Sequence, residues 1–295
     1  MIESQLKRAV ARLHRSPAQK ILDPGLYRFF ARWQARRGEG RIVPAQLFFG
    51  RQMNVVLPEI VSEQIFTYGL FDDVVSWLAV KATRPGDIVL DIGAHFGYFT
   101  LLFSELVGPT GRVVAFEPTP STFGLLKGNI DRYQNIVAEN LALGRECGEA
   151  ELCDHGLKYC AWNSLAKESR LGELPPGVTP TQVTVGLTSV DEYVRLHGLQ
   201  PRLIKIDAEN FEAEVIIGAE QTIRSCKPAV IMETGSVAAL QAGGYLLEHG
   251  YQLFVSEAYG SLDHWSADLE VANARYKDIL FVPSARRQEF LGKHS

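Results

Sequence analysis

Short apolar runs alternate with stretches of helical periodicity from about residue 60 to the end of the chain. Residues 88–91 read as a strand buried on both faces, and residues 97–106 follow with helical character. Further strands are expected at residues 112–117, 136–143, 203–207, 229–233, 251–255 and 279–282, and further helices at 121–133, 211–224 and 237–249. This alternation predicts a doubly wound α/β fold, in which helices cover both faces of a mostly parallel sheet.

The first 59 residues differ from the rest of the chain in charge and in pattern. Residues 1–41 contain ten Lys and Arg against three Asp and Glu, a net charge of +7, whereas the other 254 residues carry −11. Apolar positions at helical spacing predict two amphipathic helices, over residues 2–13 and 22–33. We therefore expect a basic helical extension over residues 1–59 and a main domain over residues 60–295. We favour packing of this extension on the main domain or across a homodimer over peripheral contact with an anionic membrane.

Residues 145–182 interrupt the alternation of strands and helices. Glycines and three prolines lie there among polar residues, which predicts an irregular or hairpin insertion on the substrate side of the sheet. Tyr159, Trp162, Asn163 and Ser164 are candidates to contact an apolar or sugar-like ligand. An aromatic plug over the core is the alternative.

The composition narrows the class of protein. A chain that is 46% hydrophobic and 22% charged, with a net charge of −4, is neither disordered nor suited to coat nucleic acid. No apolar run approaches the roughly 18 residues that a bilayer span needs, and the N-terminus lacks the apolar core of a secretory signal, so we expect a cytoplasmic protein. The four cysteines have no Cys-x-x-Cys spacing and are expected to be free thiols.

The segment 89–100 carries the strongest chemical signal. A strand ends at Asp91, and the chain turns through Gly93 and Gly97 into a helix, which places backbone N–H groups beside a ligand at the edge of the sheet. The dinucleotide pattern G-x-G-x-x-G would need glycine at 93, 95 and 98, but His95 and Tyr98 stand at two of those positions. The segment therefore predicts a ligand other than NAD, and the acid favours a cationic one.

A second acid ends the neighbouring strand. Glu117 follows Phe116 and lies 26 residues after Asp91. A carboxylate at the tip of this strand can accept hydrogen bonds from both ribose hydroxyls of an adenosine moiety. The alternative is that Glu117 only caps the following helix.

Five segments in order resemble the motifs of the FkbM family of class I S-adenosylmethionine-dependent methyltransferases. They are Asp-Ile-Gly-Ala-His-Phe-Gly-Tyr-Phe-Thr from residue 91, Phe-Glu-Pro from 116, Asn-Leu-Ala-Leu from 140, Leu-Thr-Ser-Val-Asp from 187 and Leu-Ile-Lys-Ile-Asp-Ala-Glu from 203. The resemblance covers roughly residues 60 to 285. It implies a Rossmann-like seven-stranded sheet with an antiparallel last strand, and methyl transfer, often to an oxygen of a sugar, polyketide or other secondary metabolite. The implied cofactor-binding residues are Tyr68, Asp91, Gly93, Ala94, His95, Gly97, Glu117, Pro118, Asn140, Ala142 and Asp207.

Two positions depart from the family pattern. His95 stands where the family usually has Asn, and Asn210 stands where it usually has Gly. The first departure bears on contacts near the methionine part of the cofactor. The second bears on a turn in which glycine adopts positive φ more easily than other residues.

Three acids at strand ends are the candidates for chemistry. Methyl transfer needs an oriented acceptor and, for a hydroxyl, a group that takes its proton. We expect Asp207 to hold the cofactor's ammonium group and Glu209 to orient or deprotonate the acceptor, unless Glu209 only starts the next helix. Mg²⁺ held by Asp207 and Glu233 is disfavoured because the sequence shows no Asp-rich cluster. Zinc held by the residues Cys153, Asp154, His155 and Cys160 is disfavoured because their spacing is irregular.

The sequence therefore predicts a methyltransferase that uses S-adenosylmethionine. The favoured acceptor is a hydroxyl on a small molecule, sugar or glycolipid precursor, with no metal and no nucleic-acid partner. The alternatives are a cofactor-binding scaffold without catalysis and, less favoured, an NAD-linked oxidoreductase.

Overall fold

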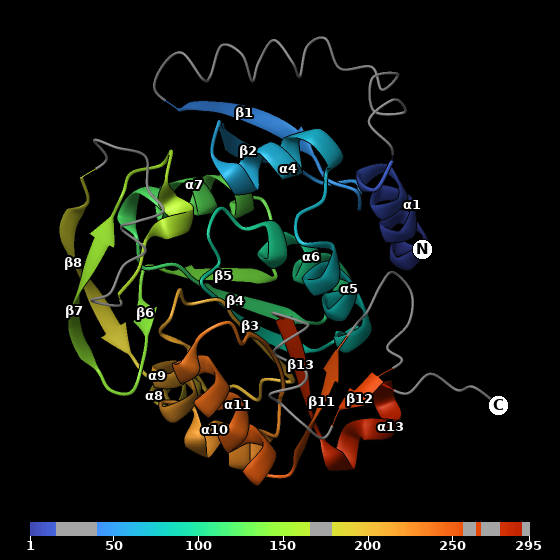
Figure 1. Cartoon of the computed structure of the whole chain (residues 1–295), viewed down its shortest axis with the longest axis vertical. Helices are drawn as coiled ribbons and strands as arrows, with labels where there is room; N and C mark the ends of the chain where they lie inside the picture. Colours follow the sequence, from blue (N-terminus) through green and yellow to red (C-terminus); the bar gives the residue numbers. More distant parts are fainter. Residues whose placement is uncertain (16–39, 166–178, 256–263, 267–277, 291–295) are drawn as a thin grey trace.

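The central sheet contains eight strands, which Figure 1 shows from one side. In this computed structural model the described residues are 1–15, 40–165, 179–255, 264–266 and 278–290. The strands are β3 (Ile88–Ile92), β4 (Arg112–Phe116), β5 (Ile136–Glu139), β9 (Leu203–Ile206), β10 (Ala229–Glu233), β11 (Tyr251–Val255), β12 (His264–Ser266) and β13 (Asp278–Pro283). Their order in the sheet is β12-β11-β13-β10-β9-β3-β4-β5.

The sheet has the predicted mostly parallel character. β5, β4, β3, β9 and β10 are parallel neighbours, and β13 runs antiparallel between β10 and β11. The expected seven strands and the antiparallel last strand are therefore confirmed. β12 is an additional short strand that pairs with the edge of β11, where the sequence analysis predicts no strand.

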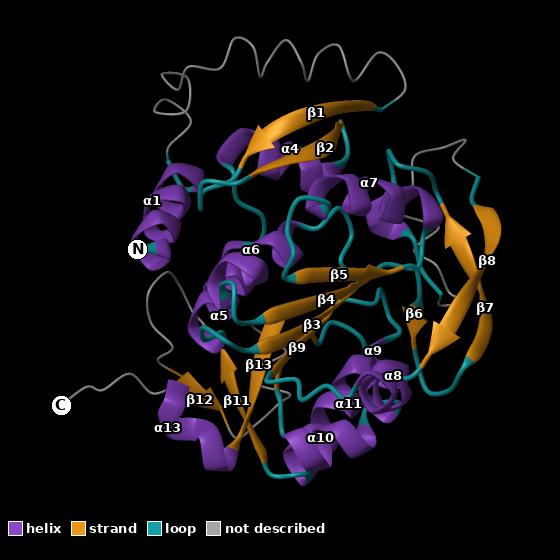
Figure 2. Cartoon of the chain, turned by 180° about the vertical axis from the view of Figure 1, so that it is seen from behind, coloured by secondary structure: helices purple, strands orange, loops and turns teal. Residues whose placement is uncertain are grey.

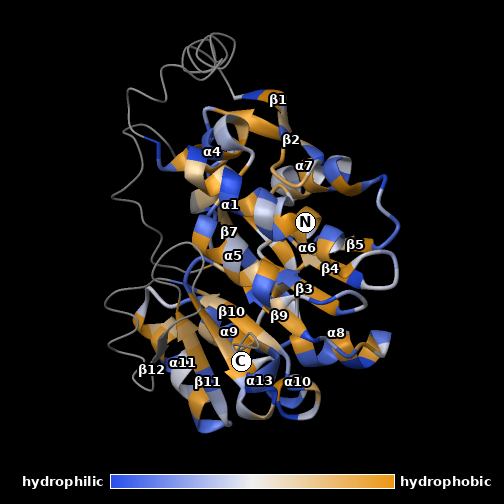
Figure 3. Ribbon diagram, turned by 90° about the vertical axis from the view of Figure 1, so that its right-hand side faces the viewer, coloured by the Kyte–Doolittle hydropathy of each residue, from blue (hydrophilic) through white to orange (hydrophobic). Residues whose placement is uncertain are grey.

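Helices cover both faces of the sheet, as a doubly wound fold requires. Figure 2 shows one layer on each side of the central strands. The first layer contains α5 (Asp73–Ala82), α6 (Tyr98–Val107) and α7 (Pro120–Ile130), and the second contains α8 (Val190–His197), α9 (Glu212–Ile217), α10 (Glu220–Cys226) and α11 (Val237–Glu248). Val89 packs into the first layer and Leu90 into the second, because successive strand residues point to opposite faces. Figure 3 accordingly shows β9 and β10 as mostly hydrophobic, whereas α8 carries both kinds of residue.

The helix predicted over residues 211–224 is divided into α9 and α10. The division falls at Gly218, where an added Cβ would lie 1.9 Å from the carbonyl oxygen of Gly144. The chain therefore needs glycine at this point for close backbone packing, and the helix is interrupted there.

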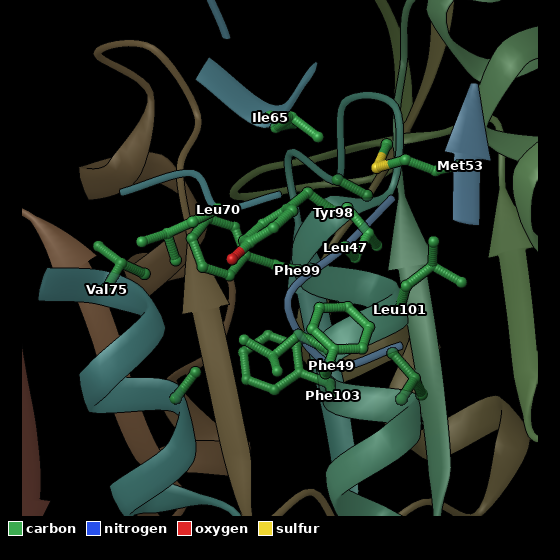
Figure 4. Close-up of a cluster of buried hydrophobic side chains, with 14 of the residues drawn as sticks. Leu47, Phe49, Met53, Ile65, Leu70, Val75, Tyr98, Phe99, Leu101 and Phe103 are labelled. Carbon is green, nitrogen blue, oxygen red and sulfur yellow. The ribbon is translucent and has the colours of Figure 1, made fainter. Parts of the chain in front are cut away.

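The N-terminal segment is only partly helical. α1 (Ile2–Leu13) is present as predicted, but β1 (Arg41–Gln46) and β2 (Gln52–Leu57) form an antiparallel hairpin ahead of α4 (Ile60–Tyr68). The prediction of a helical extension is therefore wrong for residues 41–57, where alternate residues of β1 are buried and exposed. Figure 4 shows why: Phe49 and Met53 lie in one apolar cluster with Tyr98 and Phe103 of α6. The second predicted helix, over residues 22–33, lies outside the described residues.

α1 packs on the main domain through its apolar stripe. Leu6, Ala9 and Val10 are buried. Glu3 forms an ion pair with Lys81 of α5 at 3.0 Å. The main domain of the same chain therefore covers the apolar stripe of α1. No helix within the described ranges is long and apolar enough to cross a bilayer.

The insertion forms a second, smaller sheet beside the first. β6 (Ala142–Leu143), β7 (Gly148–Asp154) and β8 (Thr181–Thr188) pair in the order β6-β8-β7, with a short 3-10 turn, η1 (Cys160–Trp162), between the last two. β7 and β8 are an antiparallel hairpin, one of the two forms expected. The strand predicted over residues 136–143 is split, because the chain leaves the central sheet after β5 and joins the second sheet at β6.

Candidate functional site

A cavity of about 300 Å³ lies where the parallel strands end. Residues at the carboxyl ends of β3, β4, β9 and β10 form its floor, as expected for a ligand site in a doubly wound sheet. Other walls come from the β1–β2 hairpin, α4 and the insertion. Of the predicted cofactor-binding and catalytic residues, eight line the cavity: Gly93, Ala94, His95, Glu117, Pro118, Ala142, Asp207 and Glu209.

The loop after β3 is held by contacts within the protein. Gly93 has φ 74°, and an added Cβ would lie 1.8 Å from the carbonyl oxygen of Asp207. The N–H groups of Gly93 and Ala94 both donate to the carbonyl of Phe116, at 3.0 and 2.9 Å. The prediction that backbone N–H groups here face a ligand is therefore wrong for these two residues, which join β3 to β4 instead. Gly97 does not line the cavity, because its position packs against Leu126.

Glu117 is buried at the cavity wall. One carboxylate oxygen accepts from the N–H of His95 and the other from the N–H of Thr119, each at 3.0 Å. Burial raises the pKa of Glu117 to about 7. Thr119 is the N-cap of α7, so Glu117 fixes this helix entry and also presents its carboxylate to the cavity. The helix-entry role considered from the sequence is therefore present, and the ribose-binding role stays a prediction.

Asp91 lies beneath the cavity. It is fully buried and accepts from the hydroxyl of Thr100 at 2.6 Å. Its other carboxylate oxygen lies 3.8 Å from Nζ of Lys205. Asp91 does not line the cavity, and it contacts Thr100 and Lys205 as a positioning residue.

Lys205 was missed by the sequence reading. It is buried on β9, lines the cavity and forms an ion pair with Asp207 at 3.2 Å. Burial alone would lower the pKa of Lys205, but Asp207 and Asp91 outweigh burial and raise it. The available signal was a lysine within the apolar run 203–206, since buried lysines are rare unless paired.

Further carboxylates surround Lys205. Asp72, the N-cap of α5, and Asp278 of β13 line the cavity with Asp207, and Asp278 lies opposite Glu233 in the sheet. Burial raises the pKa of Asp72 to about 6. Burial and the neighbouring acids raise the pKa of Asp278 as well. Lys205 is the one Lys or Arg among the described lining residues, so this part of the cavity suits a ligand with positive charge.

Glu209 sits in a strained turn at the cavity. Glu209 and Asn210 have φ 47° and 73°. Ser164 of the insertion donates to the carbonyl of Glu209 at 2.7 Å. The carboxylate of Glu212 accepts from the N–H groups of Ala208 and Asn210, at 3.1 and 3.2 Å. Glu212 is therefore the acid that holds the helix entry, and Glu209 lines the cavity ahead of it.

Two more predicted residues lie outside the cavity lining. Asn140 donates to the carbonyls of Glu117 and Pro118, each at 2.8 Å, and so fixes the end of β4. Tyr68 does not line the cavity: α4 ends there, the chain turns at Gly69 with φ 68°, and Phe71 lines the cavity.

The insertion contributes part of the predicted set. Asn163 and Ser164 line the cavity, whereas Tyr159 does not. The side chain of Trp162 lies outside the described structure. The four cysteines are free thiols, as expected. Cys160 also lines the cavity, where its Sγ lies 3.0 Å from Nε2 of His95. Burial lowers the pKa of His95.

Comparison with known proteins finds similarity to methyltransferases. The family model of the methyltransferase FkbM domain matches residues 91–253. The 31-O-demethyl-FK506 methyltransferase FkbM of Streptomyces tacrolimicus is 47% identical over 51 residues, 17% of this chain and 19% of that protein. The hexuronic acid methyltransferase AglP of Haloferax volcanii is 26% identical over 155 residues, 52% of this chain and 59% of that protein.

A solved structure of methyltransferase FkbM from Methylobacillus flagellatus aligns with 70% of this chain and 50% of its own, with 15% identity and a TM-score of 0.44. The chain thus matches less than two thirds of the length of each of these relatives.

Proposed function

Because this chain belongs to the methyltransferase FkbM family, we propose that it transfers the methyl group of S-adenosylmethionine to a hydroxyl of a small molecule, sugar or glycolipid precursor. One observation carries the proposal. Glu117 and the loop after β3 share a single cavity with Asp207 and Glu209, at the carboxyl ends of adjacent strands. This arrangement supports a cofactor held by Glu117 and Asp207 with an acceptor beside Glu209.

The residues fit this cofactor. Each Glu117 oxygen accepts one backbone N–H and keeps a lone pair that can accept from a ribose hydroxyl. Pro118 and Ala142 line the cavity beside Glu117 and supply apolar surface for an adenine ring. The carboxylates around Lys205 suit a sulfonium and an ammonium group. When bound, S-adenosylmethionine supplies a methyl group on a positively charged sulfur.

The chain's own contribution is placement and proton handling. Asp207 is 39% exposed at the end of β9 and is oriented by Lys205, so it is the candidate to hold an ammonium group. Glu209 is fixed from both sides of its turn and is the candidate to orient the acceptor hydroxyl or take its proton. The apolar side chains of Val61, Ile65 and Phe71 restrict water at the same cavity.

The relatives support an oxygen acceptor. One is named for a 31-O-demethyl compound and another for a hexuronic acid. These names motivate a panel that contains sugars with free hydroxyls, uronic acids and hydroxylated polyketides.

Calorimetry with S-adenosylmethionine and S-adenosylhomocysteine tests the cofactor. Both should bind, and Glu117→Ala should weaken both by roughly ten- to a hundredfold, since it removes charge-assisted hydrogen bonds of roughly 1.5–3 kcal/mol. Binding of NADH in place of S-adenosylhomocysteine would contradict the proposal.

Isotopically labelled methyl donor and mass spectrometry of the products then test the acceptor and the two acids. Glu209→Gln should lower turnover and leave cofactor affinity within a few-fold, whereas Asp207→Asn should lower cofactor affinity. Equal loss of cofactor affinity in both variants would remove Glu209 from the catalytic role. Binding of the cofactor without transfer to any acceptor in the panel would favour a scaffold.

A further inference from the structure

Three side chains from distant parts of the sequence converge beside the cavity. Glu59 precedes α4, His95 lies in the loop after β3, and Cys160 begins η1 of the insertion. One ligand atom from each, a carboxylate oxygen, an imidazole nitrogen and Sγ, lies within 4.8 Å of the other two. Among the residues that the structure describes, this is the group of three His, Cys, Asp or Glu side chains with converging ligand atoms.

The burial of Glu59 needs a physical explanation. Its side chain is 0% exposed, and its two oxygens accept from the N–H groups of Val61 and Ser62, at 2.9 and 2.6 Å. Carboxylates in protein interiors are normally paired with a cation or bound to a metal. Within the described ranges no Lys or Arg forms an ion pair with Glu59, which is the N-cap of α4 and has ligand atoms of His95 and Cys160 within 4.8 Å. Among the described residues the charge of this acid is therefore offset by N–H groups at the start of a helix and not by a basic side chain.

The carboxylate of Glu59 is held in place by backbone donors. The two N–H groups fix the plane of the Glu59 carboxylate, and each oxygen keeps a lone pair. Backbone donors of this kind hold a ligand carboxylate in place. The thiol of Cys160 donates to the carbonyl of Leu157 at 3.2 Å, a hydrogen bond that it must give up to bind a metal as a thiolate.

We propose that Glu59, His95 and Cys160 bind a Zn²⁺ ion. Thiolate sulfur, imidazole nitrogen and carboxylate oxygen are the ligands that zinc takes, and three protein ligands leave a fourth tetrahedral position for water or another oxygen ligand. His95 and Cys160 line the cavity, so the fourth position faces it.

The observed distance requires a small adjustment. With Zn–N and Zn–S bonds of about 2.05 and 2.3 Å, a tetrahedral ion separates the two ligand atoms by about 3.5 Å. Nε2 of His95 and Sγ of Cys160 lie 3.0 Å apart, so they must separate by about 0.5 Å. This zinc set differs from the one considered in the sequence, because it takes Cys160 but neither Cys153 nor His155.

The experiment uses the full chain without an affinity tag, stripped of metal by a chelator and dialysed. Titration with Co²⁺ should give a thiolate-to-cobalt charge-transfer band that saturates at one ion per chain, and Zn²⁺ should displace it. Cys160→Ser should abolish the band, and Glu59→Gln and His95→Asn should each weaken binding at least tenfold. Cys153→Ser and His155→Asn are matched controls and should leave the titration unchanged.

Absence of stoichiometric binding, or a band that survives in Cys160→Ser or disappears in Cys153→Ser, would overturn the proposal. Circular dichroism accompanies each variant to show that it is folded, and calorimetry with S-adenosylhomocysteine accompanies the unmodified chain. A folded chain that binds this nucleotide but neither Co²⁺ nor Zn²⁺ refutes the metal site and leaves the methyltransferase proposal standing. Conversely, stoichiometric metal binding without nucleotide binding supports the site alone.

Discussion

Replacing Glu117 by Gln should remove a loss of stability that the protein undergoes as pH rises, and should weaken binding of S-adenosylhomocysteine. The substitution keeps the size of the side chain and removes its charge. Glu117 is buried between the loop after β3 and the entry of α7, and burial raises its pKa from 4.5 to about 7. Because the folded-state pKa is the higher one, folding takes up a proton between these values, and stability falls as pH rises through this window.

The magnitude follows from the size of this shift. A difference of about 2.5 pH units corresponds to about 3 kcal/mol of unfolding free energy, lost by the native protein between pH 4.5 and 7. Gln cannot ionise, but its amide nitrogen cannot accept one of the two N–H groups that the Glu117 carboxylate accepts, a loss that is the same at every pH. We therefore expect the unfolding free energy of Glu117→Gln to rise relative to that of the unmodified protein by about 2–3 kcal/mol between pH 5 and pH 8. Affinity for S-adenosylhomocysteine at pH 8 should fall at least tenfold.

Urea unfolding at pH 5, 6.5 and 8 is the assay, with bound nucleotide first removed because a ligand of the native state adds its own stability. Glu149→Gln, which changes an exposed acid on β7, is the matched control and should show no pH-dependent difference. A difference between Glu117→Gln and the unmodified protein that is constant from pH 5 to pH 8 would refute the reasoning, as would a difference in favour of Glu117→Gln that falls as pH rises.

Three further substitutions test the packing of buried residues, two at the site and one in α1. Lys205→Met should lower the unfolding free energy in urea by about 3–5 kcal/mol, because Asp91 loses its buried cation, and Asp91→Asn in the same chain should restore part of the loss; purely additive effects would contradict the pair. Gly93→Ala should prevent a stable fold, since Cβ would meet a carbonyl at 1.8 Å, whereas Gly124→Ala, with open space around it, should stabilise α7 by up to about 1 kcal/mol; equal effects would be inconsistent with this backbone contact. Leu6→Ala should cost about 2–4 kcal/mol by loss of burial, against less than about 0.5 kcal/mol for the exposed Arg8→Ala, and an unchanged midpoint for Leu6→Ala would show that α1 does not contribute to stability.

The elements that could be predicted are those whose signal is local in the sequence. Buried strands such as β3 and β10 are continuous apolar runs, and Gly93 and Glu117 stand at fixed positions relative to their strands. The hairpin of β1 and β2 also carries a local signal, since Val43 and Ala45 alternate with exposed residues. The helical pattern and basic charge earlier in the extension nevertheless led to the prediction of a helical extension over residues 1–59.

The residues that were missed depend on tertiary neighbours. Lys205 belongs in an apolar strand only because Asp91 and Asp207 lie on either side of it. Asp72 and Asp278 are about 200 residues apart in sequence and meet because β13 inserts next to β10. Periodicity along the chain cannot predict such pairings, because they depend on the order of strands in the sheet.

The origin of the cavity walls has a consequence for how the cavity can change by mutation. The floor, with Glu117 and Asp207, lies within the region matched by the family model, residues 91–253. Met53, Ile65 and Phe71 line the same cavity from segments that precede this region, and Asp278 lines it from a segment that follows. Substitutions in the flanking segments can therefore change the shape and charge of the cavity while Glu117 and Asp207 keep their places at the strand ends.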